Sequence, residues 1–537
     1  MSAGKETLRR LLWAAAFAGL TLYAACGAGG LRLSFRWVYY PDLTVLYFIQ
    51  GLGDPSLFPR DAVVRFLREH LQPGSREFLW FSLMRAAAFP FGLAAGLKAL
   101  SIALCAFGAL QARRVGRIMG GEGGATLMTA LFLAVFLSTD CFFGYPRAFG
   151  AVLLCLAARF LFEERYGPLP VLFASAGLLY PAFVPPLGLL AVLAPLADRE
   201  GFRRSARPAP YAAATAAAAG ICVWAAFTGA ARGFLSSPEE FETYKLYQGS
   251  RVPLDPRRAY DFLAYYVLNL NEHGELYPRA LAALGALTAV LGAARGRALR
   301  VPRPLGLLLV ACAAAGAALY PFSPATSSKL FVFAVPFALC VLACRWALDL
   351  GRPALVAWVA GAALALGAFG QARWSDMRLA SGARPLFERL EAAPVSVLVA
   401  GHPDSVLVSE IPFFARRSAV VARELDELYW MAYGGPTRAA RREKLLDALY
   451  TPSPAVLARY AAEEGVDYFV VEEAHYGEGF LAGLRMESSP SARSLLARLE
   501  RTPSGRSALL RLARERSEFS FSDRGSTVHL VRVPRPL

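Results

Sequence analysis

Residues 39–61, YYPDLTVLYFIQGLGDPSLFPRD, place Asp42, Asp54 and Asp61 just beyond the first of many apolar segments. Carboxylates held at a membrane surface are positioned for proton transfer to or from a lipid-borne substrate. A solvated loop with a helix cap at its end would explain the same residues without chemistry. The rest of the chain has to decide between these two interpretations.

The composition predicts an α-helical polytopic membrane protein. Of 537 residues, 56% are hydrophobic and only 18% are charged, and the mean hydropathy is +0.39, which is far from the balance of a soluble domain. A membrane-spanning helix needs about 20 apolar residues, and about eleven segments approach that length: 11–30, 92–112, 124–142, 146–163, 168–181, 183–197, 209–229, 279–293, 304–321, 328–347 and 353–371. The segments 168–181 and 183–197 are short, and the prolines between them fit either a kink in one span or a re-entrant hairpin.

Basic residues between the spans predict the orientation, because short loops rich in Lys and Arg stay on the cytoplasmic side. This places the N-terminus in the cytoplasm, and the loops 31–91 and 230–278 with everything after 371 outside the cytoplasmic membrane. The formal charge of +16 then reflects topology and anionic lipid and requires no nucleic acid. The basic residues are Lys5, Arg9, Arg10, Arg113, Arg114, Arg117, Arg165, Arg199, Arg203, Arg204, Arg207, Arg295, Arg297, Arg300 and Arg303.

Each carboxylate of the opening stretch has a different local setting. Asp61 precedes AVVRFLREHL, whose apolar residues recur at helical spacing, so it is expected to cap an interfacial helix. Asp54, in GDPSLFP, is expected to form a turn. Asp42 follows a proline among aromatic residues near the membrane, where partial burial would suit it to accept a proton from a hydroxyl. A purely structural Asp42 remains an equal alternative.

Four further ionisable residues lie at the edges of predicted spans: Lys98, Asp140, Arg147 and Lys329. The predicted topology puts all of them toward the outer face. Charge near hydrocarbon is costly and usually functional, so cations there would suit a phosphate or pyrophosphate leaving group. The alternative for each cation is that its side chain extends to the interface without a ligand. The eight Cys lie in or beside spans and the five His are scattered, so the sequence predicts no metal site.

From about 372 the chain becomes charged and mixed, and about 165 residues suffice for one domain. Apolar runs at 395–401, 418–422, 467–472 and 526–533 predict strands. They alternate with predicted helices at 404–414, 438–450, 454–464, 490–501 and 505–516, which indicates an α/β domain with a largely parallel sheet. No nucleotide-binding motif is present. His402 and Asp404 follow the first strand, where they could line a ligand crevice or form a turn and a helix cap.

Three motifs and the layout together resemble the GT-C superfamily of integral membrane glycosyltransferases. YYPDLTVLY is similar to an acidic first-loop motif, SSKLFVFAVPF (327–337) to a late basic and aromatic span, and IPFFARRSAVVARE with GVDYFVV to soluble tails of such proteins. The chain looks most like the bacterial protein mannosyltransferase and aminoarabinose transferase branch. The similarity implies a transmembrane GT-C domain, 1–371, and a soluble α/β extracytoplasmic domain, 372–537.

The resemblance also implies an activity. Such enzymes transfer a sugar, with inversion, from a polyprenyl-phosphate donor to a lipid, glycan or protein acceptor on the outer face. Asp42 would then be the general base, and Lys329, with Lys98 or Arg147, would bind phosphate; Asp140 and Asp61 would also contact substrate. Many members have two adjacent acidic residues at this place, whereas Leu43 follows Asp42, which weakens the expectation of a divalent metal. A lipid or sugar flippase and a non-catalytic glycolipid-binding assembly protein remain the alternatives.

Overall fold

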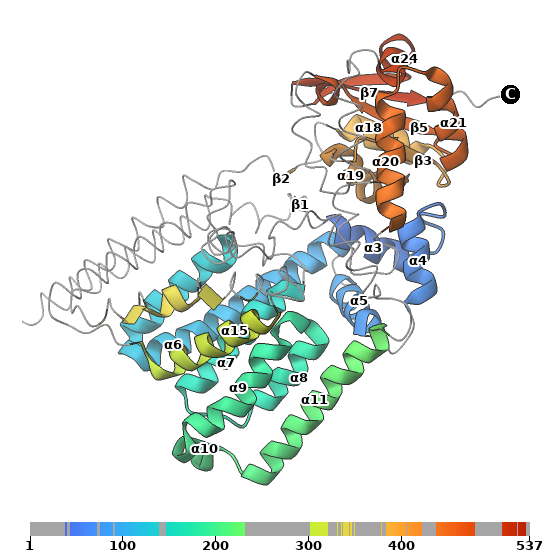
Figure 1. The fold of residues 1–537 in the computed structure, drawn as a ribbon. Helices are drawn as coiled ribbons and strands as arrows, with labels where there is room; N and C mark the ends of the chain where they lie inside the picture. Colours follow the sequence, from blue (N-terminus) through green and yellow to red (C-terminus); the bar gives the residue numbers. More distant parts are fainter. Residues whose placement is uncertain are drawn as a thin grey trace, which may run out of the picture. The chain divides into compact units, whose positions relative to one another are not determined.

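The computed structural model describes residues 38–39, 43–71, 76–89, 92–138, 146–230, 301–319, parts of 330–348, 377–378, 383–421 except 404, 436–477, 507–523 and 525–532. Within these residues the chain forms two compact units. One contains the described residues of Ala87–Ala226 and of Val252–Met377, and the other joins those of Val38–Ala86 to those of Arg378–Leu537. The second unit therefore combines the first predicted outside loop with the C-terminal tail (Figure 1).

The first unit is helical. Its elements are α6 (Leu93–Ser138), α7 (Pro146–Phe162), α8 (Leu169–Leu179), the 3₁₀ turn η2 (Pro181–Phe183), α9 (Val184–Ala197), α10 (Arg199–Ser205), α11 (Pro208–Ala230) and α15 (Arg303–Leu319). Helix α7 packs against α6, and α15 packs against both α7 and α9. Helices α7, α8, α9, α11 and α15 follow predicted apolar segments closely, because apolar runs bounded by charged or proline-containing turns favour helices. Segment α6 instead covers two predicted segments, and the charged helix α10 matches none.

Segment α6 consists of two helices separated by a break, where the sequence predicts a loop between two spans. Gly120 and Gly121 leave the helical conformation, and Gly121 has a φ of 64°, which glycine adopts without a steric penalty. Next to the break, Glu122 forms ion pairs with Arg113 at 2.7 Å and with Arg117 at 2.6 Å. The basic loop predicted at this position is thus a turn with local charge pairing.

Helices α8 and α9 fold back on each other. A Cβ added to Gly188 in α9 would lie 3.1 Å from the Phe173 ring in α8, and the two residues are equidistant from the turn at Tyr180 and Pro181. This pairing excludes one kinked span and supports the hairpin alternative for 168–197.

Two of the described helical segments are long and apolar enough to span a membrane, Ala95–Leu133 and Pro208–Thr228, and a bent pair at Pro181–Ser205 would make a third. The predicted spans 11–30, 279–293 and 353–371 lie outside the described residues. The membrane character of the chain is supported, while the eleven spans and their orientation stay predictions.

A five-stranded sheet lies at the centre of the C-terminal tail. Its strands are β3 (Leu398–Gly401), β4 (Ser418–Ala419), β5 (Tyr468–Glu472), β6 (Phe519–Asp523) and β7 (Ser526–Arg532), in the order β4-β3-β5-β7-β6. Strand β3 pairs in parallel with β4 and β5, whereas β7 runs antiparallel to both β5 and β6. The largely parallel sheet expected from the sequence is thus wrong. It is mixed, because a two-residue turn containing Gly525, at φ 78°, makes β6 and β7 a hairpin. A separate two-stranded sheet pairs β1 (Val38–Tyr39) with β2 (Met377–Arg378).

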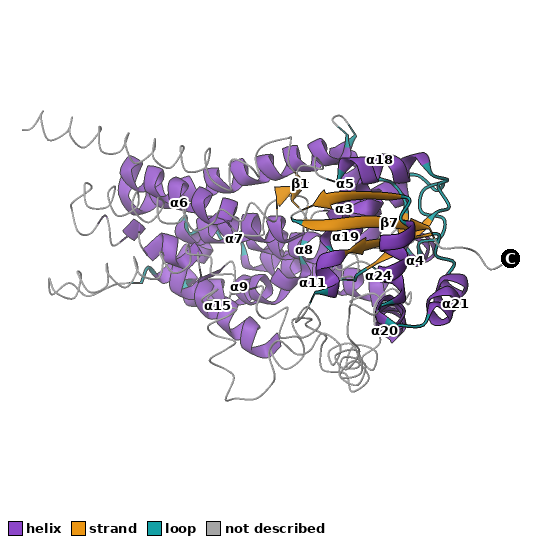
Figure 2. Ribbon diagram, turned by 90° about the horizontal axis from the view of Figure 1, so that it is seen from above, coloured by secondary structure: helices purple, strands orange, loops and turns teal. Residues whose placement is uncertain are grey.

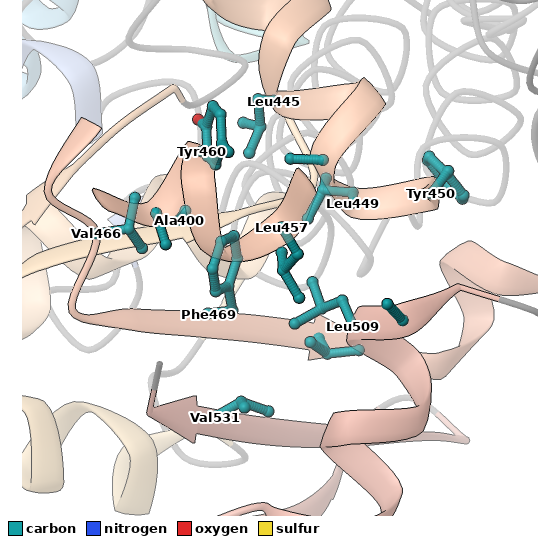
Figure 3. Packing of buried hydrophobic residues seen from close by; sticks show 14 of the residues in the cluster. Ala400, Leu445, Leu449, Tyr450, Leu457, Tyr460, Val466, Phe469, Leu509 and Val531 are labelled. Atoms are coloured by element: carbon teal, nitrogen blue, oxygen red, sulfur yellow. The ribbon is translucent and has the colours of Figure 1, made fainter. Parts of the chain in front are cut away.

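One face of this sheet packs against three helices, α20 (Pro436–Tyr450), α21 (Pro454–Glu464) and α24 (Ala508–Arg516) (Figure 3). Phe469 of β5 and Val531 of β7 are fully buried there beneath Leu449 and Leu509. Alternate strand residues point to opposite faces, so Leu398 and Ala400 join this core and Val399 faces the other side.

That other face is covered by α19 (Val406–Phe414), which packs against β3 and β4. Phe414 stacks on Phe387 of α18 (Arg384–Ala392) with ring centroids 5.2 Å apart. The sheet therefore has helices on both faces, as Figure 2 shows from above. Helix α18 and strand β6 have no counterpart in the sequence predictions, and the predicted helix 490–501 lies outside the described residues.

Candidate functional site

The first-loop hairpin, defined here as residues 43–70, consists of α3 (Leu43–Gly53) and α4 (Ala62–His70) and begins directly after Asp42. Tyr47 of α3 is buried and packs edge-on against Phe58 in the connecting turn, with ring centroids 4.7 Å apart. Phe58 has a φ of 55°, which is unusual for a bulky residue and is maintained here by its complete burial. The hairpin is thus a packed element of the fold.

Arg68 of α4 connects this helix to the turn after α3 by hydrogen bonds. Its guanidinium donates to three backbone carbonyls, those of Gly51 at 2.6 Å, Asp54 at 2.9 Å and Leu57 at 2.8 Å. The last carbonyls of a helix have no partner inside the helix, and a cation is favourable at that end. Arg68 therefore both terminates α3 and closes the hairpin.

Asp61 and Asp54 have the local roles that the sequence predicts. Asp61 is buried, and its Oδ1 accepts the Val64 amide at 2.9 Å, which confirms the N-cap of α4. The Asp54 Oδ1 accepts from the Ser56 amide at 2.9 Å and the Ser56 hydroxyl at 2.6 Å, which confirms the turn. These hydrogen bonds from Ser56 lower the pKa of the Asp54 carboxyl, with further lowering by the charges of Arg68 and Arg416.

The expected interfacial role of α4 is wrong for its apolar face. Val64 and Leu67 are 0% and 1% exposed, because α4 packs against α3 and Val64 approaches Gly51 closely. Protein covers the side that was expected to meet lipid. The next helix, α5 (Arg76–Ala88), is the one that exposes large apolar side chains, namely Phe78, Leu79 and Leu83.

The first-loop hairpin packs onto the α/β domain. Helix α3 contacts α19, whose residues Leu407–Pro412 are all buried. Consecutive residues of a helix point in all directions, so α19 is covered on the side of the sheet and on the side of α3. Arg60 donates to Asp467 Oδ2 at 2.9 Å, to the Ser396 carbonyl at 3.3 Å and to the Gly465 carbonyl.

The structure describes only part of the predicted site. Asp42, Asp140 and Lys329 lie outside the described residues. Arg147 is in the first turn of α7, and Lys98 is in α6 with a side chain that is only 3% exposed. The expected grouping of these residues, and a substrate contact by Asp61, stay predictions. A buried lysine is unusual and requires compensating interactions, which makes Lys98 the most informative described cation of this set.

His402 and His475 lie just beyond the carboxyl ends of β3 and β5. The His402 ring is buried, 4.7 Å from the His475 ring between centroids. Burial, together with the charges of His475 and Arg442, lowers the pKa of His402 well below its usual value. Helix α19 is capped by Ser405, whose Oγ accepts the Val408 amide at 3.0 Å. The sequence predicts Asp404 as the cap. Asp404 itself lies outside the described residues.

Among the described residues, no group of three or more His, Cys, Asp or Glu side chains is arranged to hold a metal ion. No protein-family model and no curated protein matches the sequence.

Solved structures similar to the chain include an oligosaccharyltransferase from Archaeoglobus fulgidus. Its complex with zinc and sulfate has a TM-score of 0.48 and 11% identity, covering 96% of this chain and 73% of that chain. Its complex with an inhibitory peptide and a dolichol-phosphate has a TM-score of 0.49 and 11% identity, covering 90% and 71%. At this identity and TM-score, we assign no role to any residue of this chain from the similarity.

The contacts of Arg60, Arg68 and Asp467 are absent from the sequence predictions. Arg60 and Asp467 are 407 positions apart, and nothing local in either segment indicates the partner. The one available signal for Arg68 is its place on the polar side of an amphipathic helix, which equally fits a solvated cation.

Proposed function

We propose that the chain is a membrane glycosyltransferase of the GT-C type. It would transfer a hexosyl or pentosyl group from a polyprenyl-phosphate donor to an acceptor on the outer face of a bacterial cytoplasmic membrane. The observation that carries the proposal is the division of roles among the first-loop aspartates. Asp61 caps α4 and Asp54 forms a turn, which leaves Asp42, directly before the anchored helix α3, as the candidate base.

The reaction would be an inverting displacement. Asp42 would accept the proton of an acceptor hydroxyl while that oxygen attacks the anomeric carbon of the donor. The bond between this carbon and the phosphate oxygen breaks, and polyprenyl phosphate leaves with the bonding electrons. Lys329, with Lys98 or Arg147, would stabilise the negative charge that develops on the phosphate.

Asp42→Asn tests the assignment of the base. The purified full chain in proteoliposomes would be supplied with a labelled polyprenyl-phosphate sugar and a mixture of membrane acceptors. We expect the variant to lose about 100-fold or more in transfer rate, since general base catalysis contributes on that order. Asp54→Asn is the matched control, a carboxylate of the same loop with a structural role, and should retain transfer within about threefold, because that carboxylate only forms a turn.

Equal transfer by wild type and Asp42→Asn would contradict the base. Movement of the labelled lipid across the bilayer without a new glycosidic bond would instead support a flippase and contradict the proposed activity.

A further inference from the structure

We propose that Arg60 is a positioning residue, through which the C-terminal α/β domain sets the placement of the first-loop hairpin. The inference rests on the proposed function in one respect, namely that this hairpin carries the base Asp42 at its start. The anchoring itself is a property of the fold and can be measured without turnover.

The partners of Arg60 lie at one place in the domain. Ser396 precedes β3, and Gly465 and Asp467 precede β5. Strands β3 and β5 are parallel neighbours, so these residues meet at the amino-terminal edge of the sheet. One guanidinium therefore bridges two loops of the domain, which requires the planar set of donors that arginine has and lysine lacks.

The ion pair is integrated into the domain. Asp467 has a side chain that is only 14% exposed, and its Oδ2 also accepts the Leu398 amide at 3.0 Å. Exposed, isolated ion pairs contribute little, whereas this carboxylate links β3, the loop before β5 and the hairpin. Its position is determined by the sheet and not by the side chain of Arg60.

The approach of Arg60 also depends on glycine. Gly465 ends α21 with a φ of 68°, in the left-handed region that favours this residue. A Cβ at this position would lie only 2.0 Å from Arg60 Nη2. The bare backbone thus leaves the Gly465 carbonyl accessible to the guanidinium.

Hydrogen bonds and packing connect the parts of the hairpin, so the contacts of Arg60 also restrict the position of α3 at its start. Arg68 binds three carbonyls of the turn, and Asp61 caps α4 next to Arg60. Helix α3 is packed on one side against α4 and on another against α19. The first residue of α3, Leu43, immediately follows Asp42. A shift of α3 would therefore also move the proposed base.

The test compares Arg60→Ala and Arg60→Lys with Arg65→Ala in the full chain in lipid nanodiscs. Arg65 is an exposed arginine of the same hairpin, in α4, and serves as the matched control. In Arg60→Ala we expect hydrogen exchange of the amides of 43–58 to rise about tenfold or more, because charge-assisted hydrogen bonds are lost. Exchange of the amides of β5 and β7 should rise less than that of 43–58, because the hairpin can then open without the sheet. Exchange in Arg60→Lys should fall between wild type and alanine.

Turnover provides the readout that separates positioning from stability. Per folded enzyme, Arg60→Ala should lower kcat about tenfold or more with KM for the labelled polyprenyl-phosphate sugar within about twofold, since misplacement of a catalytic group costs rate. Wild-type exchange of 43–58 in Arg60→Ala would overturn the anchoring. Raised exchange with unchanged kcat in an active enzyme would overturn the positioning role. An inactive wild type would refute the proposed function while the exchange result still decides the anchoring.

Discussion

Helices α4 and α5 are neighbours in the first loop, yet they bury their apolar residues differently. In α4, Val64 and Leu67 are covered by protein, and Arg65 and Glu69 are exposed. In α5, Phe81 and Met84 are buried while Leu79 is 47% exposed on another face. One apolar face fits a helix of the protein core, whereas apolar residues on two faces leave a surface that protein does not cover. Amphipathicity alone therefore does not identify the helix that has an exposed apolar surface.

The largest expected difference is between the packed first-loop hairpin, which contains α3 and α4, and the exposed side of α5. Phe48 of α3 is 2% exposed in the second unit, so Phe48→Ala should lower the free energy of unfolding of that unit by about 3–5 kcal/mol. Leu79→Ala on the exposed side of α5 should cost less than about 1 kcal/mol, since surface substitutions have small effects. Urea unfolding in nanodiscs, followed by tryptophan fluorescence and by circular dichroism, measures both.

Equal losses for the two variants would contradict the contrast between a packed hairpin and an exposed face. A loss for Leu79→Ala alone would reverse it.

A smaller effect is expected at the N-cap of α4. Asp61→Ala removes the acceptor of the Val64 amide and should cost about 1 kcal/mol, within the usual range of about 0.5–2. Asp61→Asn should retain nearly all of this stability, because asparagine caps as well as aspartate. The asparagine variant also separates the cap from substrate binding: unchanged stability with unchanged transfer supports the cap alone, and unchanged stability with lost transfer shows a role for the charge.

Much of the fold could be predicted because its signals are local. The predicted segment 454–464 coincides with α21, and 146–163 nearly coincides with α7. Strand β6 was missed because its burial alternates only between half-buried and exposed, so no apolar run marks it. The antiparallel placement of β7 also has no local signal beyond the turn at Gly525, since strand order is decided by packing of the whole domain.

The candidate site divides in the same way. The roles of Asp61 and Asp54 could be predicted because their partners lie three and two residues away. The contacts of Arg60 with Gly465 and Asp467 could not, because they join segments more than 400 residues apart. The interfacial assignment of α4 failed for this reason too: the sequence indicates an apolar face but not the protein that covers it.

Native-state hydrogen exchange of the unmodified chain tests the central claim, that the first-loop hairpin and the α/β domain are one structural unit. Exchange would be followed in nanodiscs at increasing urea concentrations below the unfolding transition. Amides of one cooperative unit open with a common free energy and a common urea dependence. We expect the amides of α3 to converge with those of β3 and β5 onto one opening reaction. Opening of α3 at lower free energy, with no dependence on urea, would show a loop that moves independently and would contradict a single structural unit.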